Sequence, residues 1–426
     1  METGDEKRQP LLQEPTAKRS FNDLPPELLD NIVNYLDAPA PSASRLHAEP
    51  DYNITYSEAR FLKSASLVCR RWRISAMPLL YRHVCLKIHN YSTPFPILTN
   101  EDGPFFDFID RYGLRCVIES FTLCIKDTKA LLEAREPQEN NCKPFWARVF
   151  TDIDPDTLTI VASPQVLQPL TSCHVWSDDS WSFDMPYHIL QLRRPTLPNK
   201  SSSCSQRPSE DVLEARPLRH SVLLHSRPWT SLLLNEGSFI RSFTQYEFFN
   251  KRPPSLLPDL LGSEAGIDRA MLPSTVRELS YIAMFPTSTH FNHLTSRCPR
   301  LDRLYVQFVP RSDVLRDPAQ MDHVDTNDLW LERNSCYALV MRELFNHPPS
   351  GNFQFLREFE SGDHADIDGW EMAVEYVRRA NLSWRVDRPG VFVRVPEDGE
   401  GEEGEDAVRV EQQPDTLPLL VNHGSA

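Results

Sequence analysis

The chain has 426 residues, of which 45 are basic and 60 acidic, so its formal net charge is −15. Its 14 glycines are about 3% of the residues, against a usual ~7%, which argues against the glycine-rich phosphate loops of nucleotide-binding enzymes. The 36 prolines favour many short elements, because proline is excluded from helix interiors and central strands. Lys and Arg are nowhere dense enough for a nucleic-acid partner. No apolar run approaches the ~18–20 residues of a membrane span, which argues against a membrane partner.

The two ends of the chain and its cysteines point to the cell interior. Residues 1–20 mix both charge signs with proline and lack the apolar core of a secretory signal, so we expect a disordered leader. Residues 397–426 hold nine acids and one base, which predicts a solvated, disordered acidic tail. The nine cysteines include no CxxC pair and indicate reduced thiols, not a disulfide framework or zinc site. We expect a cytoplasmic and/or nuclear protein.

The first predicted helix lies within residues 21–36. Pro25 suits the start of a helix, where a missing N–H costs nothing. Leu28, Ile32 and Leu36 then recur every four residues, as on one face of an amphipathic helix. This segment therefore predicts a short helix with one broad apolar face.

A second helical tract is expected to begin near Ser57 and to continue to Trp72, after which Pro78 opens a further short turn. Helices of this size bury too little surface to be stable alone. Their apolar side chains must therefore be covered by the rest of the chain or by another protein. An ordinary helical cap on a larger domain is the plainer of these two interpretations.

The segments LPPELLDNIVNYL and SLVCRRWRISAMPLLYRHV resemble the F-box, a motif that docks onto the Skp-family adaptor of cullin–RING ubiquitin ligases. The resemblance covers the Leu-Pro opening, the first helix and the Leu-Val-Cys-x-x-Trp core of the later helix. It assigns nine residues to the adaptor-binding surface: Leu24, Pro25, Leu28, Ile32, Leu36, Leu67, Val68, Cys69 and Trp72. It implies an F-box over residues 21–88.

One departure from the F-box pattern is an inserted loop at about residues 37–56, which separates the two matching segments by more than the family spacing. Long insertions cost little closure entropy, because that cost grows only logarithmically with loop length. The insertion could nevertheless obstruct the adaptor, or replace the usual middle helix.

Residues 89–396 are expected to form one target-binding domain. An apolar-x-x-apolar-x-apolar pattern recurs in it and just before it, as expected for short strands entering the coils of a solenoid. Its occurrences are Tyr81/Val84/Leu86, Ile118/Phe121/Leu123, Val276/Leu279/Tyr281, Leu301/Leu304/Val306, and a later candidate at Leu356/Phe359. The sequence CPRLDRLYV at 298–306 resembles the junctions of the leucine-rich repeats that often follow F-boxes. The uneven spacing predicts a degenerate solenoid with long insertions.

The other predicted elements complete this domain. Residues 329–345 are expected to form an inserted or capping helix, residues 367–377 an amphipathic helix, and residues 391–395 the last strand. Residues 136–143 and 199–217 show no periodicity and are expected to be surface loops. The fold class is thus α+β or α/β: a small helical F-box, then an irregular leucine-rich-repeat-like solenoid between disordered termini.

A search for chemistry gives no catalytic, metal or cofactor site. His323 and His364 have carboxylates beside them, but side chains adjacent in sequence diverge, so solvated loops explain these clusters better than metal binding. Cys173 and His174 are also adjacent, whereas a nucleophile and its base usually meet across a fold. We therefore expect a protein that is not an enzyme and needs no cofactor.

Four aromatic residues, Trp176, Trp181, Phe183 and Tyr187, lie close together in the sequence. Core packing is the simpler interpretation of such a cluster. The alternative is a recognition surface, because exposed aromatic side chains commonly anchor protein interfaces.

The sequence favours a substrate-recognition subunit of an SCF-type ubiquitin ligase. The F-box would bind the Skp-family adaptor and, through it, a cullin, while the central domain binds an unidentified protein target. An adaptor-bound scaffold or structural interaction protein without a ligase role is the alternative. A central domain with an enzymatic activity of its own is the least favoured possibility, because the glycine content is low and catalytic signatures are missing.

Overall fold

The structure is a computed structural model that describes eleven stretches of the chain: residues 24–40, 43–54, 59–88, 104–115, 117–126, 142–195, 222–263, 270–309, 313–345, 351–380 and 383–395. The expected leader, the acidic tail and the expected loop at 199–217 lie outside the described residues, as does most of the loop at 136–143.

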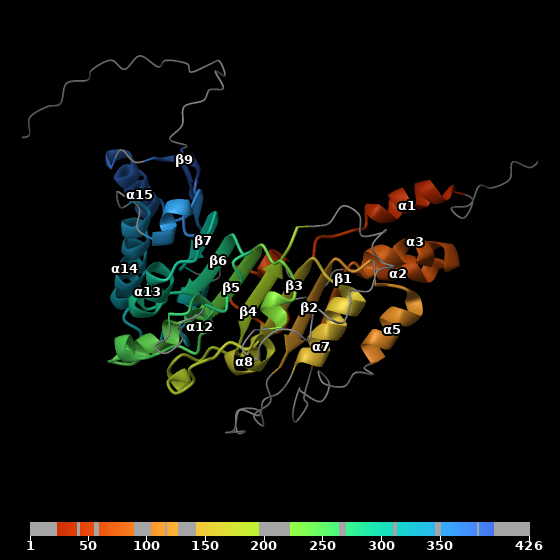
Figure 1. Cartoon of the computed structure of the whole chain (residues 1–426), viewed down its shortest axis with the longest axis horizontal. Coiled ribbons are helices and arrows are strands. Elements are labelled where there is room, and N and C mark those ends of the chain that lie inside the picture. Colours follow the sequence, from red (N-terminus) through yellow and green to blue (C-terminus); the bar gives the residue numbers. More distant parts are fainter. Residues whose placement is uncertain are drawn as a thin grey trace, which may run out of the picture.

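Three short helices stand at one end of the described fold: α1 (Pro26–Asn34), α2 (Arg60–Val68) and α3 (Arg70–Leu80) (Figure 1). The expectation of one continuous second tract is wrong, because the backbone is extended at Cys69 (φ −160°, ψ 175°) and this residue separates α2 from α3. Pro78 lies inside α3 and does not open a new turn. Helix α3 leads almost directly into the first strand, so the helical end is continuous with the sheet.

A ten-stranded sheet forms the body of the protein, with strand order β1-β2-β3-β4-β5-β6-β7-β8-β10-β9. The strands are β1 (His83–Ile88), β2 (Ser120–Ile125), β3 (Thr157–Ala162), β4 (His188–Arg193), β5 (Ser231–Ser238), β6 (Glu278–Met284), β7 (Arg303–Gln307), β8 (Glu358–Ser361), β9 (Trp384–Arg388) and β10 (Val391–Arg394). Five strand pairs in the described chain are parallel: β1–β2, β2–β3, β5–β6, β6–β7 and β7–β8. The fold prediction is thus confirmed: a helical unit is followed by a mixed, mostly parallel sheet.

The recurring apolar pattern coincides with five of the seven strands that have a parallel neighbour. Its occurrences lead into β1, β2, β6, β7 and β8, and their second positions lie in register, as Leu279 does with Leu304 and Leu304 with Phe359. At each parallel strand pair, the backbone carbonyl of a residue just before one strand accepts hydrogen bonds from two consecutive backbone N–H groups at the start of the neighbouring strand. The Arg277 carbonyl, for example, accepts from Asp302 and Arg303. The pattern therefore corresponds to repeated turns of the chain.

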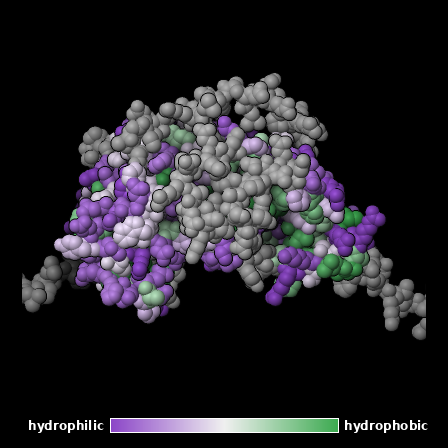
Figure 2. Space-filling model, turned by 90° about the horizontal axis from the view of Figure 1, so that it is seen from below, coloured by the Kyte–Doolittle hydropathy of each residue, from purple (hydrophilic) through white to green (hydrophobic). Residues whose placement is uncertain are grey.

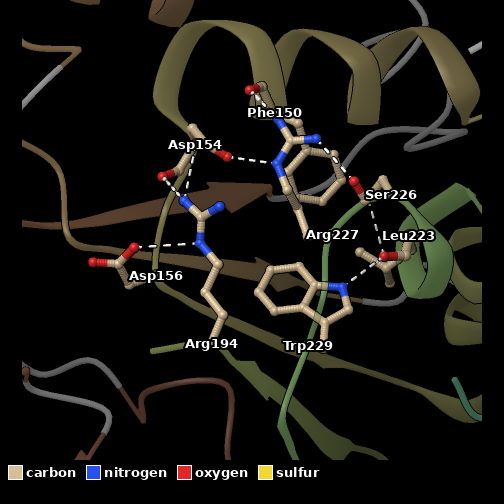
Figure 3. Close-up of polar contacts among 8 residues, drawn as sticks. All are labelled: Phe150, Asp154, Asp156, Arg194, Leu223, Ser226, Arg227 and Trp229. Carbon is tan, nitrogen blue, oxygen red and sulfur yellow. Dashed lines mark hydrogen bonds and ion pairs between the residues drawn. The ribbon is translucent and has the colours of Figure 1, made fainter. Parts of the chain in front are cut away.

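The repeat is interrupted at β4, which pairs antiparallel with both β3 and β5. Figure 3 shows the ion pairs that hold this reversal together at one edge of the sheet. Arg194, just after β4, pairs with Asp154 at 2.9 Å and with Asp156 at 3.3 Å. Arg227, just before β5, pairs with the same Asp154 at 2.6 Å and donates to the Phe150 carbonyl at 2.7 Å. This network joins the ends of three neighbouring strands.

Helices cover one face of the sheet. They are α5 (Pro104–Tyr112), α7 (Lys143–Arg148), α8 (Pro164–Thr171), α11 (Val222–His225), α12 (Leu257–Leu261), α13 (Ser288–Ser296), α14 (Thr326–Phe345) and α15 (Ile367–Arg379). Alternate strand residues such as Phe121, Leu190 and Leu304 point toward these helices and form the main core with them. The helices expected at 329–345 and 367–377 are α14 and α15, although Ile367 is exposed. We call the opposite side of the sheet its open face.

Candidate functional site

Helices α1, α2 and α3 form a small core of their own. Leu29, Val33, Leu62 and Ala76 are buried in it, and four half-buried side chains pack around them: Leu36, Trp72, Leu79 and Leu80. This small core therefore covers only part of the apolar surface of the three helices.

The remaining apolar side chains of this helical unit are exposed. Leu28 is 49% and Ile32 36% exposed on α1, while Leu67 is 74% and Val68 62% exposed at the end of α2. Their neighbours Tyr35, Phe61 and Ile74 are exposed too. Figure 2 shows apolar surface gathered at this end of the molecule. Such a concentration of solvent-facing apolar residues is typical of a surface that another protein covers.

The structure brings the nine sequence-predicted residues into one helical unit but gives them different surroundings. Pro25, Leu28, Ile32, Leu67 and Val68 are exposed. The other four, Leu24, Leu36, Cys69 and Trp72, are half-buried. The broad apolar face expected on α1 is therefore divided, with Leu29 and Val33 turned inward and Leu28 and Ile32 outward.

Helix α3 is fixed to the sheet at its carboxyl end. Arg82 pairs with Asp37 at 2.6 Å, and its carbonyl accepts the N–H groups of Glu119 and Ser120 from the adjacent coil. The Tyr81 ring packs against Phe108 of α5, with ring centroids 5.4 Å apart. The helical unit therefore shares its last residues with the first coil of the sheet.

Part of the expected inserted loop lies against the open face of the sheet. We call residues 43–54 the strap. Its side chains Leu46, Tyr52 and Ile54 are buried in one apolar cluster with residues from six neighbouring strands. Those strand residues are Cys124, Val161, Ile189, Leu233, Ile282 and Tyr305. The insertion thus packs as a structural element.

Polar groups of the open face hold the strap backbone. The fully buried Asn235 amide donates to the carbonyls of Leu46 at 2.8 Å and Ala48 at 2.7 Å. The Tyr52 hydroxyl donates to the Ile88 carbonyl at 3.4 Å, and burial raises the pKa of Tyr52. Gly237 has φ +76°, and a Cβ there would lie 3.4 Å from the Pro50 ring. A side chain at this position would therefore be strained by the positive φ, while its Cβ would make an ordinary contact with the strap.

No sequence pattern predicted where the strap would pack. Asn235 and Gly237 lie in a long interval in which no repeat was expected, and the strap itself has no periodicity. The only indication available was the length of the insertion, since a long insertion with buried apolar residues needs a surface to cover.

The structure shows the surroundings of the residue pairs that were considered as catalytic or metal sites. Cys173 is fully buried, and burial raises the pKa of its thiol to about 12. Asp363, beside His364, accepts hydrogen bonds from Phe308 N at 2.7 Å and from the Tyr337 hydroxyl at 2.6 Å. His323 is highly exposed. Among the described residues, no three His, Cys, Asp or Glu side chains gather where they could hold a metal ion.

The predicted aromatic cluster is divided between core and surface. Phe183 is buried against Phe239, with ring centroids 5.7 Å apart, whereas Trp181 is 63% exposed. Core packing is therefore found for Phe183, whereas Trp181 lies on the surface.

A buried polar cluster was not expected from the sequence. Glu236 is fully buried and accepts hydrogen bonds from Tyr281 at 2.7 Å, from His290 Nε2 at 3.0 Å and from Ser255. Burial alone raises the pKa of Glu236, but His290, His188 and Ser255 together outweigh burial and lower this pKa to about 2. His188 is also fully buried, and burial lowers its pKa to about 4. These residues are far apart in the sequence, so no local pattern joins them.

Comparisons with known proteins agree with the helical unit. The family described as F-box-like matches residues 21–87. No curated protein and no solved structure matches the chain. Within the described part of the chain, no helix combines the length and apolar character that a membrane crossing requires. The chain therefore carries an F-box-like domain at residues 21–87, followed by a long mixed, mostly parallel sheet consistent with a leucine-rich-repeat-like domain.

Proposed function

We propose that this protein is the substrate-recognition subunit of an SCF-type cullin–RING ubiquitin ligase. The F-box-like domain would bind the Skp-family adaptor, and the sheet domain at 89–396 would hold a protein target. The observation that carries the proposal is the exposure of Leu28, Ile32, Leu67 and Val68 on helices whose inward apolar residues form a small core of their own. These side chains offer an apolar surface that the described chain leaves in contact with solvent.

The proposed mechanism requires no catalytic group in this chain. A target held on the sheet domain meets the ubiquitin-charged enzyme of the same complex as an intramolecular neighbour, at an effective concentration set by the geometry of the connection. That geometry is defined here by two attachments. Arg82 joins α3 to the first coil, and Asn235 holds the strap across the open face. A target would therefore be presented at a defined distance from the adaptor. The expected site of action is cytoplasmic and/or nuclear.

The test is co-purification of the full chain with the Skp-family adaptor and a cullin, compared with a Val68→Asp variant. We expect both partners with the unaltered chain and neither with the variant, because a buried unpaired carboxylate opposes the interface. Leu331→Asp, a change at an apolar side chain of similar exposure (64%) outside the F-box-like domain, is the matched control and should retain both partners. Adaptor binding without a cullin would favour the scaffold alternative, and failure to bind the adaptor would overturn the proposal.

A further inference from the structure

Two loops form an exposed aromatic and basic surface at the end of the sheet where β5 ends and β4 begins. Trp181 comes from the loop before β4, and Phe249, 51% exposed, from the loop after β5. Asp179 joins the loops, because it pairs with Lys251 at 3.5 Å and accepts the backbone N–H of Arg252 at 3.2 Å. We call this region the aromatic–basic surface, and Tyr246 in it is 94% exposed. Its members are Trp176, Trp181, Tyr246, Phe249, Lys251 and Arg252.

A small cavity of about 140 Å³ opens in this surface, between the loops and α13. Trp176, Phe249 and Arg252 form part of its wall, and His290 and His293 of α13 form another part. Its volume is well below the ~300–1,000 Å³ of small-molecule sites. The cavity therefore suits one side chain of a bound polypeptide better than a metabolite.

The charge of the cavity lining favours an anion. The described lining residues include two cationic side chains, Lys251 and Arg252, and no Asp or Glu, and Lys251 also pairs with Asp179 at 3.5 Å from outside the lining. The Arg252 guanidinium lies 4.3 Å from the centre of the Trp176 ring, and Lys251 Nζ lies 5.1 Å from that of Trp181. An aromatic face orients a cation without neutralising its charge.

Two carboxylates near the cavity already have partners. Glu236 lies behind His290, is fully buried, and is held by His290, Tyr281 and Ser255. Asp179 joins the two loops from outside the lining. Neither is among the residues that a ligand in the cavity would meet first.

Within the described residues, the two faces of the sheet are largely covered. Helices cover one face of the sheet, and the strap covers the middle of the other between β2 and β7. The loops at the ends of the strands are left, and exposed aromatic residues in such loops are typical anchors of protein interfaces.

We propose that the aromatic–basic surface is the docking site of the protein target, and that the target presents an acidic segment. One anionic side chain, a carboxylate or a phosphate ester, enters the cavity beside Arg252 and His293, while Trp181 and Phe249 cover the flanking residues. This inference rests on the proposed function, because it names the surface by which the central domain would hold its target.

Fluorescence polarisation with the full chain and labelled peptides tests the proposal. The peptides are seven residues long, with Gly, Ser and Phe around one central residue that is Glu, phosphoserine, Gln or Lys. We expect the Glu or the phosphoserine peptide to bind at least about tenfold more tightly than the Gln peptide, a difference of ~1.4 kcal/mol. Added salt should weaken that binding. The better of the two anionic peptides identifies the source of the charge.

Variants complete the test. Arg252→Glu should abolish the preference for anionic peptides, whereas Arg378→Glu, on the exposed side of the distant α15, should leave it unchanged. Phe249→Ser, at an exposed side chain, serves as a second variant should Arg252→Glu unfold, and should weaken binding of every peptide. Equal binding of Glu and Gln peptides, no binding of any peptide, or an unaltered preference in Arg252→Glu would overturn the inference. Continued co-purification of adaptor and cullin in those cases would leave the proposed function standing.

Discussion

Asn235 and Glu236 are adjacent in β5, yet their side chains serve opposite faces of the sheet. The Asn235 amide holds the strap on the open face, while the Glu236 carboxylate accepts hydrogen bonds from Tyr281 and His290 among the helices. Alternation of side chains along a strand explains the division. A register shift follows immediately, between Asn235 and Ser238, with Gly237 at positive φ. One short stretch of β5 thus connects the strap with α13 and the aromatic–basic surface.

The strap attachment predicts the effect of removing the Asn235 amide. Asn235→Ala leaves two carbonyls of the strap without their donor in a buried place. At ~1–3 kcal/mol for an unsatisfied buried group, we expect about 2–4 kcal/mol of lost unfolding free energy in urea denaturation. Hydrogen exchange of residues 43–54 should increase more than that of α13. Asn327→Ala, at an exposed side chain, should change neither measurement. An unaltered exchange rate in the strap would show that Asn235 does not hold it.

The outward and inward halves of α1 predict a separation between binding and stability. Leu28→Asp should reduce adaptor affinity at least about a hundredfold while the melting temperature stays within a few degrees, because Leu28 is half-exposed. Leu29→Ala should cost about 2–5 kcal/mol of stability, because Leu29 is buried in the small core. Calorimetry and adaptor titration of both variants measure the two effects. If Leu28→Asp binds the adaptor as well as the unaltered chain, the assignment of this surface is wrong.

Burial of His188 predicts a loss of stability in mild acid. The unfolded chain binds a proton at this residue near pH 6.5, whereas the folded pKa is about 4, so the unfolded state holds more protons in between. Stability should therefore fall as the pH decreases from about 6.5 to 4, by up to ~3 kcal/mol from this residue alone.

The variant His188→Leu should reduce that slope in urea denaturation at several pH values, although Glu236 and His290 remain nearby. His323→Gln, at an exposed histidine, should not change the slope. Equal slopes for His188→Leu and the unaltered chain would contradict a neutral buried imidazole.

Thiol reactivity should follow burial. Cys85 is exposed, whereas Cys173 is fully buried and its pKa is raised to about 12. Because the thiolate is the reactive form, iodoacetamide at pH 8 should label Cys85 quickly and Cys173 only after unfolding. Mass spectrometry of peptides from native and urea-treated protein measures both rates. Rapid native labelling of Cys173 would reopen the possibility of a nucleophilic cysteine.

The repeat pattern predicted the parallel strands better than the others, for a physical reason. The pattern describes a chain that enters the sheet in the same direction at every coil, as at β1, β2, β6, β7 and β8. Strand β4 runs the opposite way and pairs antiparallel on both sides, so it shows no such entry. Around it, β3 and β5 were missed, although Trp229, Leu232 and Leu234 follow the same spacing into β5 and are all buried.

The F-box-like residues could be found from sequence because their helices are local, but their surroundings could not. A four-residue repeat places Leu28 and Ile32 on one side of α1 without showing which neighbours cover Leu29 and Val33. The strap was further out of reach. The strap packs against side chains from six strands between Cys124 and Tyr305, and only the folded sheet brings these side chains together.

The strap also means that the helical unit cannot be exchanged as a separate module. A fragment that stops at residue 88 would keep Leu46, Tyr52 and Ile54 but lose the strands that shelter them. Such a fragment should aggregate through these exposed apolar side chains. Replacing the helical unit with an F-box that lacks a strap would leave the apolar middle of the open face uncovered. Recombination at this junction would destabilise both the helical unit and the sheet domain, so we expect the two to be inherited together.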